Sequence, residues 1–237
     1  MGNPSKTAAP SPDTSVLLQS ARFLTTAAEW SQLPRHDLPE VAFVGRSNAG
    51  KSSAINVLCG QRRLAFASKT PGRTQHINLF TVGMGGLAQG VLADLPGYGY
   101  ASVPLATKQR WQRFIAHYLA EREQLVGLVL IVDIRHGLGA LDWELLRYFA
   151  PAGLPVHLLL TKADKLSRNQ QLRQAQAVRD ELQRNAARAG LLAGTSAQVF
   201  SSSTRIGLVE AAALIEEWLA NGRAAPAPSA PEIGDTA

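Results

Sequence analysis

Short apolar runs and amphipathic stretches alternate along most of the chain. The runs 41–44, 125–134 and 156–160 are almost entirely apolar, which is typical of strands covered on both faces. Apolar residues then recur at spacings of three and four in 141–149 and 206–220, which indicates helices with one buried face. This alternation predicts an α/β fold, in which helices cover both faces of a mostly parallel sheet.

The other segments complete a three-layer αβα arrangement with six strands. Segments 77–82 and 90–93 flank the glycine-rich residues 83–86, which predicts an antiparallel hairpin at one edge of the sheet. A capping-box pattern at Ser167 precedes a further helix, and 198–200 has the pattern of the last strand. The apolar residues of that helix are predicted to face inward: Leu172, Ala175, Val178, Leu182 and Ala186.

Both ends of the chain are rich in proline, alanine and serine. Residues 1–18 and 222–237 could bury little apolar surface to offset the entropy cost of ordering, so we expect disordered tails. The remaining residues, 19–221, are predicted to form a single domain. A domain of that size buries roughly 70% of its unfolded surface.

The composition excludes several classes of protein. Hydrophobic residues make up 46% of the chain and charged residues 18%, which argues against collagen-like and wholly disordered proteins. The single cysteine, Cys59, cannot form an intramolecular disulfide, which favours a reducing compartment. No run approaches about 18 apolar residues, and the N-terminus lacks the apolar core of a signal peptide. We therefore expect a monomeric cytoplasmic protein with no membrane partner.

Positive charge is concentrated in one part of the chain. The net charge is +6, and between residues 41 and 120 nine basic residues stand against one acidic residue, Asp94. The basic residues are Arg46, Lys51, Arg62, Arg63, Lys69, Arg73, Lys108, Arg110 and Arg113. A local excess of this kind suits a polyanionic partner such as RNA.

Residues 45–52 match the pattern G-x-x-x-x-G-K-[ST] between a predicted strand and a predicted helix. They are Gly45, Arg46, Ser47, Asn48, Ala49, Gly50, Lys51 and Ser52. The glycines allow consecutive N–H groups to face a phosphate at the positive end of a helix dipole. Lys51 would neutralise the β- and γ-phosphates, and the Ser52 hydroxyl would be a Mg²⁺ ligand. This loop predicts binding of a nucleoside triphosphate.

Three further motifs follow predicted strands in order and identify the nucleotide. Asp94, Leu95, Pro96 and Gly97 form a D-x-x-G motif, whose carboxylate can hold Mg²⁺ through water and whose glycine N–H can contact a γ-phosphate. Thr161, Lys162, Ala163 and Asp164 form a [NT]-K-x-D motif, in which the carboxylate accepts the two N–H donors of guanine. Phe200, Ser201 and Ser202 would face guanine O6 through backbone N–H groups. Since ligands bind at the carboxyl ends of strands in open α/β sheets, the motifs together predict GTP.

The runs GRSNAGKSS, KTPGRTQHIN, DLPGYGYA, TKADK and FSSS resemble the EngB (YihA/YsxC) family of the TrmE–Era–EngA group of P-loop GTPases. The resemblance implies a Ras-like G-domain that binds GTP and GDP with Mg²⁺ and hydrolyses GTP slowly. It also implies a role in assembling the large ribosomal subunit, through contact with the subunit or its rRNA, and in normal cell division and septation.

The same resemblance assigns the first switch to Gly72, Arg73, Thr74, Gln75 and His76, with Thr74 as the second Mg²⁺ ligand beside Ser52. It assigns the second switch to residues 94–97. Lys51, Thr74 and Gly97 would be the catalytic residues. The guanine motif begins with Thr161 where the wider small-GTPase pattern has asparagine, which keeps a hydroxyl and loses an amide.

Tyr98 stands where Ras-like enzymes have the glutamine that orients the attacking water, so we expect slow intrinsic hydrolysis. Two groups could complete catalysis. Asn48 occupies a position at which related GTPases bind K⁺, although asparagine also simply suits the backbone of this loop. The ribosome could instead supply the missing group. The alternative function is a nucleotide-gated rRNA-binding module in which hydrolysis is incidental.

Overall fold

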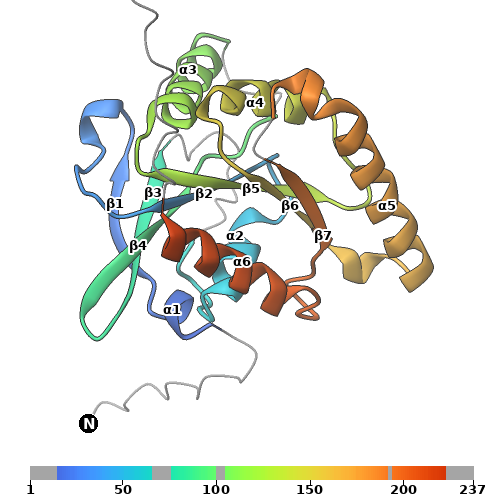
Figure 1. Cartoon of the computed structure of the whole chain (residues 1–237), viewed down its shortest axis with the longest axis horizontal. Helices are drawn as coiled ribbons and strands as arrows, with labels where there is room; N and C mark the ends of the chain where they lie inside the picture. Colours follow the sequence, from blue (N-terminus) through green and yellow to red (C-terminus); the bar gives the residue numbers. More distant parts are fainter. Residues whose placement is uncertain (1–14, 66–75, 100–104, 192–193, 223–237) are drawn as a thin grey trace, which may run out of the picture.

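The computed structural model describes residues 15–65, 76–99, 105–191 and 194–222, and of residues 105–112 it describes the helical backbone (Figure 1). A seven-stranded sheet runs through the molecule in the order β1-β3-β4-β2-β5-β6-β7. The strands are β1 (Arg22–Ala27), β2 (Glu40–Gly45), β3 (Ile77–Met84), β4 (Leu87–Asp94), β5 (Leu125–Asp133), β6 (Val156–Thr161) and β7 (Thr195–Val199). Strands β4, β2, β5, β6 and β7 are mutually parallel, and β3 is antiparallel to both of its neighbours.

The α/β fold class is confirmed, and the sheet has one strand more than the six expected. The additional strand is β1, which pairs with β3 at the edge of the sheet. Its sequence has no regular alternation, and only Ala27 in it is buried. Because an edge strand needs little apolar surface, the pattern of polar and apolar residues gave no sign of it.

Helices cover both faces of the sheet (Figure 1). One face packs against α1 (Val16–Gln19), α2 (Lys51–Leu58) and α6 (Leu208–Asn221). The other packs against α3 (Leu105–Glu121), α4 (Ala140–Phe149) and α5 (Arg168–Asn185). Short 3₁₀ turns connect several elements: η1 (Trp30–Gln32), η2 (Ala150–Ala152), η3 (Ala163–Lys165) and η4 (Ala187–Ala189). Strands β2 and β5 between the two layers are buried at every position, which is why they read as continuous apolar runs.

Two expectations about boundaries and faces are corrected. Residues 15–18 were expected in the N-terminal tail, but they begin the domain: Ser15 caps α1 by accepting a hydrogen bond from the Leu18 N–H at 2.9 Å, and the Leu18 side chain is fully buried. In α5, Leu172 is 53% exposed and Gln171 takes the inward position. The Gln171 amide donates to the carbonyl of Ala163 at 2.8 Å, so a hydrogen bond, not apolar burial, fixes that turn of the helix.

The parallel strands bring their carboxyl ends to one edge of the sheet. Strands β2, β4, β5 and β6 end at Gly45, Asp94, Asp133 and Thr161, and the pairing register places Asp133 directly beside Thr161. The loops that follow these strands therefore collect above the same edge, and they carry the motifs predicted to bind a nucleotide.

Candidate functional site

The loop between β2 and α2 is shaped by two residues in the left-handed region of the backbone. Asn48 has φ 65° and Gly50 has φ 104°. Gly45 at the start of the loop lies against β5, where a Cβ atom would come within 2.6 Å of the Ile131 carbonyl oxygen. Glycine at 45 and 50 thus meets a steric and a conformational requirement, which the loop sequence satisfies.

Two side chains from the end of β6 hold this loop from outside. The Thr161 hydroxyl donates to the Ala49 carbonyl at 2.5 Å, and the Lys162 ammonium donates to the Asn48 carbonyl at 2.6 Å. Thr161 is buried. The threonine hydroxyl therefore makes a direct contact with the loop at the position where the wider small-GTPase pattern has asparagine.

Lys51 and Asp94 form an ion pair across the site. Lys51 is the first residue of α2, and its ammonium contacts the carboxylate of Asp94 at the end of β4. The Asp94 side chain is 4% exposed. A buried carboxylate is retained at low cost only when a cation or a metal ion balances it. The pair thus places one positive and one negative charge beside the first turn of α2, where the partly exposed Ser52 also lies.

Backbone hydrogen bonds join the loop to Tyr98, the residue after the D-x-x-G motif. The Ser47 N–H donates to the Tyr98 carbonyl at 2.8 Å, and the Tyr98 N–H donates to the Gly45 carbonyl at 3.2 Å. Gly97 faces Ser47 so closely that a Cβ atom would lie 3.1 Å from the Ser47 hydroxyl oxygen. That hydroxyl is buried and has no hydrogen-bond partner within the described part of the chain. A polar atom of this kind fits a ligand-binding loop.

The side chain of Tyr98 packs against the start of α4. Its hydroxyl donates to the carboxylate of Asp142 in the first turn of α4, and both residues are buried. Burial is the main cause of a raised pKa at Tyr98 and at Asp142. The tyrosine ring is therefore packed in place, and the expectation that it cannot serve as the missing glutamine stays a prediction.

Asp164, the predicted guanine-recognition residue, is held by the loop after β7. The Ser201 hydroxyl donates to one Asp164 oxygen at 2.7 Å, and Lys165 lies 3.3 Å from the other. The hydrogen bond from Ser201 is the main cause of a lowered pKa at Asp164. The two loops are also joined by the Ala163 N–H, which donates to the Phe200 carbonyl at 3.2 Å. The result is an ionised carboxylate with a fixed orientation, suited to accept N–H donors.

Asp133 is a residue of this edge that sequence reasoning did not single out. Arg135 donates to both of its oxygens, at 2.9 and 2.7 Å, and the Lys162 ammonium lies 3.0 Å away. Burial opposes the charge of Asp133, but these hydrogen bonds hold its pKa well below the usual range. Asp133 thereby positions Lys162 over the phosphate loop. An aspartate that ends a buried strand two residues before an arginine was the available signal.

The structure brings four of the predicted segments to one edge: 45–52, 94–97, 161–164 and 200–202. His76 lies partly buried just before β3. Gly72, Arg73, Thr74 and Gln75 lie outside the described residues, as do Lys69 and the side chains of Lys108 and Arg110. The individual roles of all these residues stay predictions.

The donors at this edge fit Mg²⁺. The Ser52 hydroxyl and the Asp94 carboxylate are hard oxygen ligands, which Mg²⁺ prefers. In the part of the chain that the structure describes there is no group of three or more His, Cys, Asp or Glu side chains able to hold a metal ion. Mg²⁺ is usually held through one or two protein oxygens together with phosphates and water. Nor is any described helix long and apolar enough to span a membrane.

Comparisons with known proteins agree with this geometry. The sequence profile of a family described as "50S ribosome-binding GTPase" matches residues 40–162. A probable GTP-binding protein EngB of Paraburkholderia phymatum is 52% identical over 210 residues, which cover 89% of this chain and 95% of that protein. Its counterpart in Burkholderia thailandensis is 52% identical over 205 residues, covering 86% and 92%.

Among solved structures, that of a probable GTP-binding protein EngB covers 77% of this chain and 99% of its own, with a TM-score of 0.57 and 20% identity. Era in complex with MgGDPNP and a segment of 16S ribosomal RNA covers 84% of this chain and 61% of its own, with a TM-score of 0.58 and 20% identity. At such identities the structures show a shared fold. With the sequence relatives, they establish that this chain belongs to the EngB family of GTP-binding proteins within the P-loop GTPases.

Proposed function

We propose that the protein binds GTP with Mg²⁺, hydrolyses it slowly to GDP and phosphate, and uses this cycle to control its association with the assembling large ribosomal subunit. One observation carries the proposal: Thr161 and Lys162, three and two residues before Asp164, hold the phosphate loop by its Ala49 and Asn48 carbonyls. The phosphate-binding and guanine-binding halves of the site are therefore one connected unit.

Two of the three proposed catalytic roles rest on positions in this unit, those of Lys51 and Gly97. Lys51 would exchange its contact with Asp94 for the β- and γ-phosphates, which releases the carboxylate toward the metal ion and its water ligands. Gly97 would present its N–H to the γ-phosphate, and Thr74 would supply a hydroxyl from the first switch. Mg²⁺, when bound, neutralises charge on the β- and γ-phosphates.

Slow turnover follows from the buried Tyr98 side chain. Its hydroxyl is engaged with Asp142, and we expect none of the motif arginines to act as a finger residue. We expect an intrinsic rate well below the ~10⁻² s⁻¹ reached when an arginine is supplied in cis. A K⁺ ion held at Asn48 would raise the rate in KCl over that in NaCl at equal ionic strength. Equal rates in the two salts would reject this role of K⁺, since φ 65° already accounts for an asparagine at that position.

Association with ribosomal RNA is supported by the basic residues around the switches and by the name of the matching family. Arg62, Arg63 and Arg113 are exposed. Era, a structural neighbour, is described in complex with ribosomal RNA. We further propose a cytoplasmic monomer that also has a part in normal cell division and septation.

The experiment is a pull-down from the protein's own cells with the full chain, loaded with a non-hydrolysable GTP analogue or with GDP. Nucleotide-dependent recovery of large-subunit particles supports the proposal, and equal recovery rejects the switch. Excess ATP should not displace labelled GTP, because adenine lacks the donor pair that Asp164 accepts.

The buried Tyr98 also favours a second candidate, a nucleotide-gated rRNA-binding module in which hydrolysis is incidental. Thr74→Ala separates the two functions, because it should abolish hydrolysis with little effect on GDP binding. If this variant still binds ribosomal particles and supports growth, the second candidate holds.

A further inference from the structure

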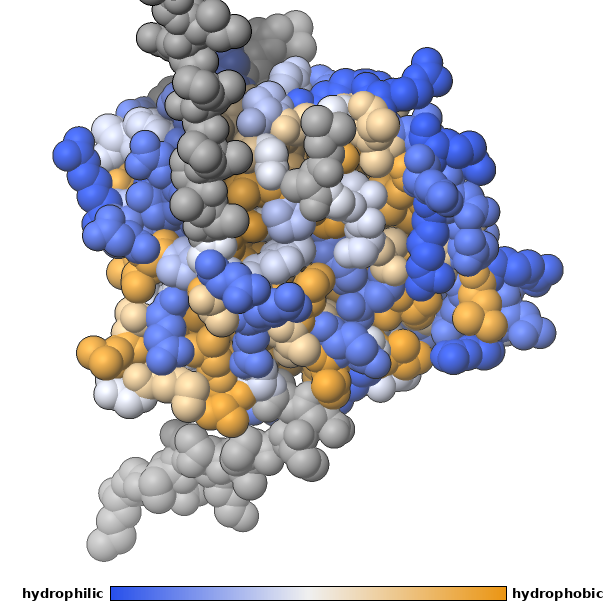
Figure 2. Space-filling model, in the orientation of Figure 1, coloured by the Kyte–Doolittle hydropathy of each residue, from blue (hydrophilic) through white to orange (hydrophobic). Residues whose placement is uncertain are grey.

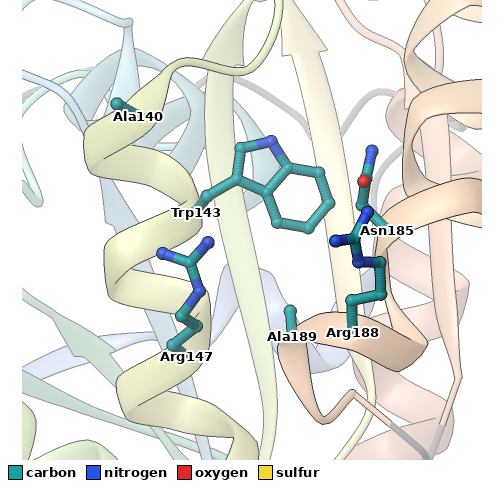
Figure 3. A pocket seen from close by; sticks show the side chains of 6 residues that line it. All are labelled: Ala140, Trp143, Arg147, Asn185, Arg188 and Ala189. Carbon is teal, nitrogen blue, oxygen red and sulfur yellow. The ribbon is translucent and has the colours of Figure 1, made fainter.

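A cleft lies between α4 and the end of α5 (Figure 3). Its volume is about 510 Å³, within the range of small-molecule sites. Six residues line this cleft, which we call the α4–α5 cleft: Ala140, Trp143, Arg147, Asn185, Arg188 and Ala189.

Two arginines stand on opposite sides of the α4–α5 cleft. Arg147 lies in the last turn of α4 and Arg188 in η4, and both are exposed (Figure 3). Within the described part of the chain, neither guanidinium has a hydrogen-bond or ion-pair partner. Two like charges that face one hollow repel each other, and a bound anion would remove that cost.

The floor of the cleft is aromatic and fixed in place. Trp143 is partly buried against the core, and its indole N–H donates to Glu181 on α5 at 2.8 Å. Asn185 is fixed in turn, because its amide donates to the Glu181 carbonyl at 2.9 Å. In Figure 3 the indole ring lies in the hollow between Arg147 on one side and Asn185 on the other. A rigid indole beside cationic groups is the arrangement on which nucleic-acid bases stack.

The positive charge extends beyond the cleft along α5. Between residues 165 and 190, six basic residues stand against two acidic ones, and both acids accept hydrogen bonds from protein donors, Asp180 from Gln176 and Glu181 from Trp143. Arg184 lies one turn before Arg188. Arg173 lies about 16 Å before Arg184 along the helix axis, on the same side of the helix. Figure 2 shows hydrophilic side chains gathered over this α5 side of the molecule. A line of charge favours a polymer over a single small anion.

We propose that the α4–α5 cleft binds a single-stranded segment of RNA, with one base against Trp143 and its flanking phosphates paired with Arg147 and Arg188. The bond to Glu181 holds the indole ready for the base, and Arg184 and Arg173 follow the strand outward. This inference rests on the proposed association with ribosomal RNA for the nature of the polyanion. It adds a contact surface separate from the residues that flank the switches.

The test measures binding of a labelled oligoadenylate about twelve nucleotides long to the GDP-loaded full chain by fluorescence anisotropy at several salt concentrations. Arg147→Gln/Arg188→Gln should weaken binding about tenfold or more and reduce the slope of log affinity against log salt by about 1 to 2. The matched control is Arg22→Gln/Arg35→Gln, which makes the same charge change at two exposed arginines of the N-terminal segment. This control should bind within about twofold of the unmodified protein.

The variant Trp143→Phe tests the contact between the base and the indole independently. Oligoadenylate should quench part of the tryptophan fluorescence of the full chain, and this quenching should disappear in the variant although three tryptophans remain. Unchanged GDP affinity in every variant checks that the domain is folded.

Three outcomes overturn the proposal. The first is an equal loss of oligoadenylate affinity in the Arg22→Gln/Arg35→Gln control, and the second is quenching that persists in Trp143→Phe. The third is competition by polyglutamate as effective as that by RNA, which would assign the cleft to acidic peptides. The proposed ribosomal function fails separately. If the unmodified protein does not bind large-subunit particles but binds oligoadenylate through the cleft, only the proposed ribosomal function is rejected. Loss of particle binding in Arg62→Gln/Arg63→Gln with oligoadenylate binding intact would assign the two surfaces to separate contacts.

Discussion

The hydroxyl of Tyr98, the residue after the D-x-x-G motif, donates a hydrogen bond to the carboxylate of Asp142 in the first turn of α4. The other oxygen of the same carboxylate accepts the Gly139 N–H at 2.7 Å and so caps that helix. One buried carboxylate therefore joins Tyr98 to the start of α4. Movement of Tyr98 would leave a buried acceptor short of one donor, so this bond stabilises the position of Tyr98.

Tyr98→Phe should lower the free energy of unfolding by about 1–3 kcal/mol, because the Asp142 carboxylate stays buried and loses a donor. Urea unfolding at neutral pH measures the change. Tyr148→Phe is the matched control, since Tyr148 is 46% exposed and its hydroxyl reaches Glu144 at only 3.4 Å. The control should change stability by less than about 0.5 kcal/mol.

The stability loss in Tyr98→Phe should also depend on pH. Burial raises the pKa of Asp142 above that of an ordinary aspartate, so ionisation of this carboxyl opposes folding as the pH rises above the ordinary pKa. The hydrogen bond from Tyr98 favours the charged form and offsets part of that cost. The loss should therefore be larger at pH 7 than at about pH 4, where the carboxyl is increasingly protonated in the native state. Equal losses at both pH values would show that this carboxyl does not ionise beside Tyr98.

The contrast between Tyr98–Asp142 and the phosphate loop shows what the sequence could predict. The loop lies in eight consecutive residues, and its glycines answer local requirements, so its position between β2 and α2 followed from the pattern alone. Tyr98 and Asp142 are 44 residues apart and meet only through tertiary packing. Strand β1 and the inward Gln171 were missed for a related reason, because pairing with β3 and a bond to Ala163 specify them instead of apolar spacing.

Asp164→Ala should weaken GTP binding about a hundredfold, since guanine loses an ionised acceptor for two N–H donors. Ser201→Ala should weaken it a few-fold, because Asp164 would lose the bond that orients its carboxylate and lowers its pKa. Titration with labelled GTP and with inosine triphosphate, whose base lacks the 2-amino donor, measures both effects. The unmodified protein should prefer GTP, and the preference should vanish in Asp164→Ala. A preference that survives would place base recognition elsewhere.

Ser52→Ala should remove most of the Mg²⁺ dependence of GTP binding, because it deletes the hydroxyl proposed as a metal ligand. Ser53→Ala is the control, since Ser53 is exposed on the same turn of α2. GTP affinity measured with Mg²⁺ and with EDTA should differ strongly for Ser53→Ala and little for Ser52→Ala. The same Mg²⁺ response in both variants would reject Ser52 as a ligand.

The opposite end of β2 carries a buried charge cluster that should govern acid stability. Glu40 is fully buried and accepts hydrogen bonds from Tyr118 at 2.7 Å and from the Arg122 Nε at 3.1 Å, and His36 lies 3.0 Å away. Burial alone would raise the pKa of Glu40, but the bonds from His36 and Arg122 outweigh it and hold the pKa below the usual 4.5. Because its pKa is lowered in the native state, the Glu40 carboxylate stabilises the fold at pH values above the ordinary pKa of glutamate. This contribution is lost as the pH falls through the native pKa.

Arg122→Met should therefore cost about 3–5 kcal/mol at pH 7, because it leaves the Glu40 charge buried with its main partner gone. Arg147→Met, at an exposed arginine in the last turn of α4, should cost less than about 0.5 kcal/mol. Glu40→Gln removes the titrating group, so the stability difference between the unmodified protein and this variant should shrink as pH falls below about 4. Urea unfolding across pH 3–7 measures both effects. A difference that stays constant over this range would mean that Glu40 carries no ionised carboxylate in the native state.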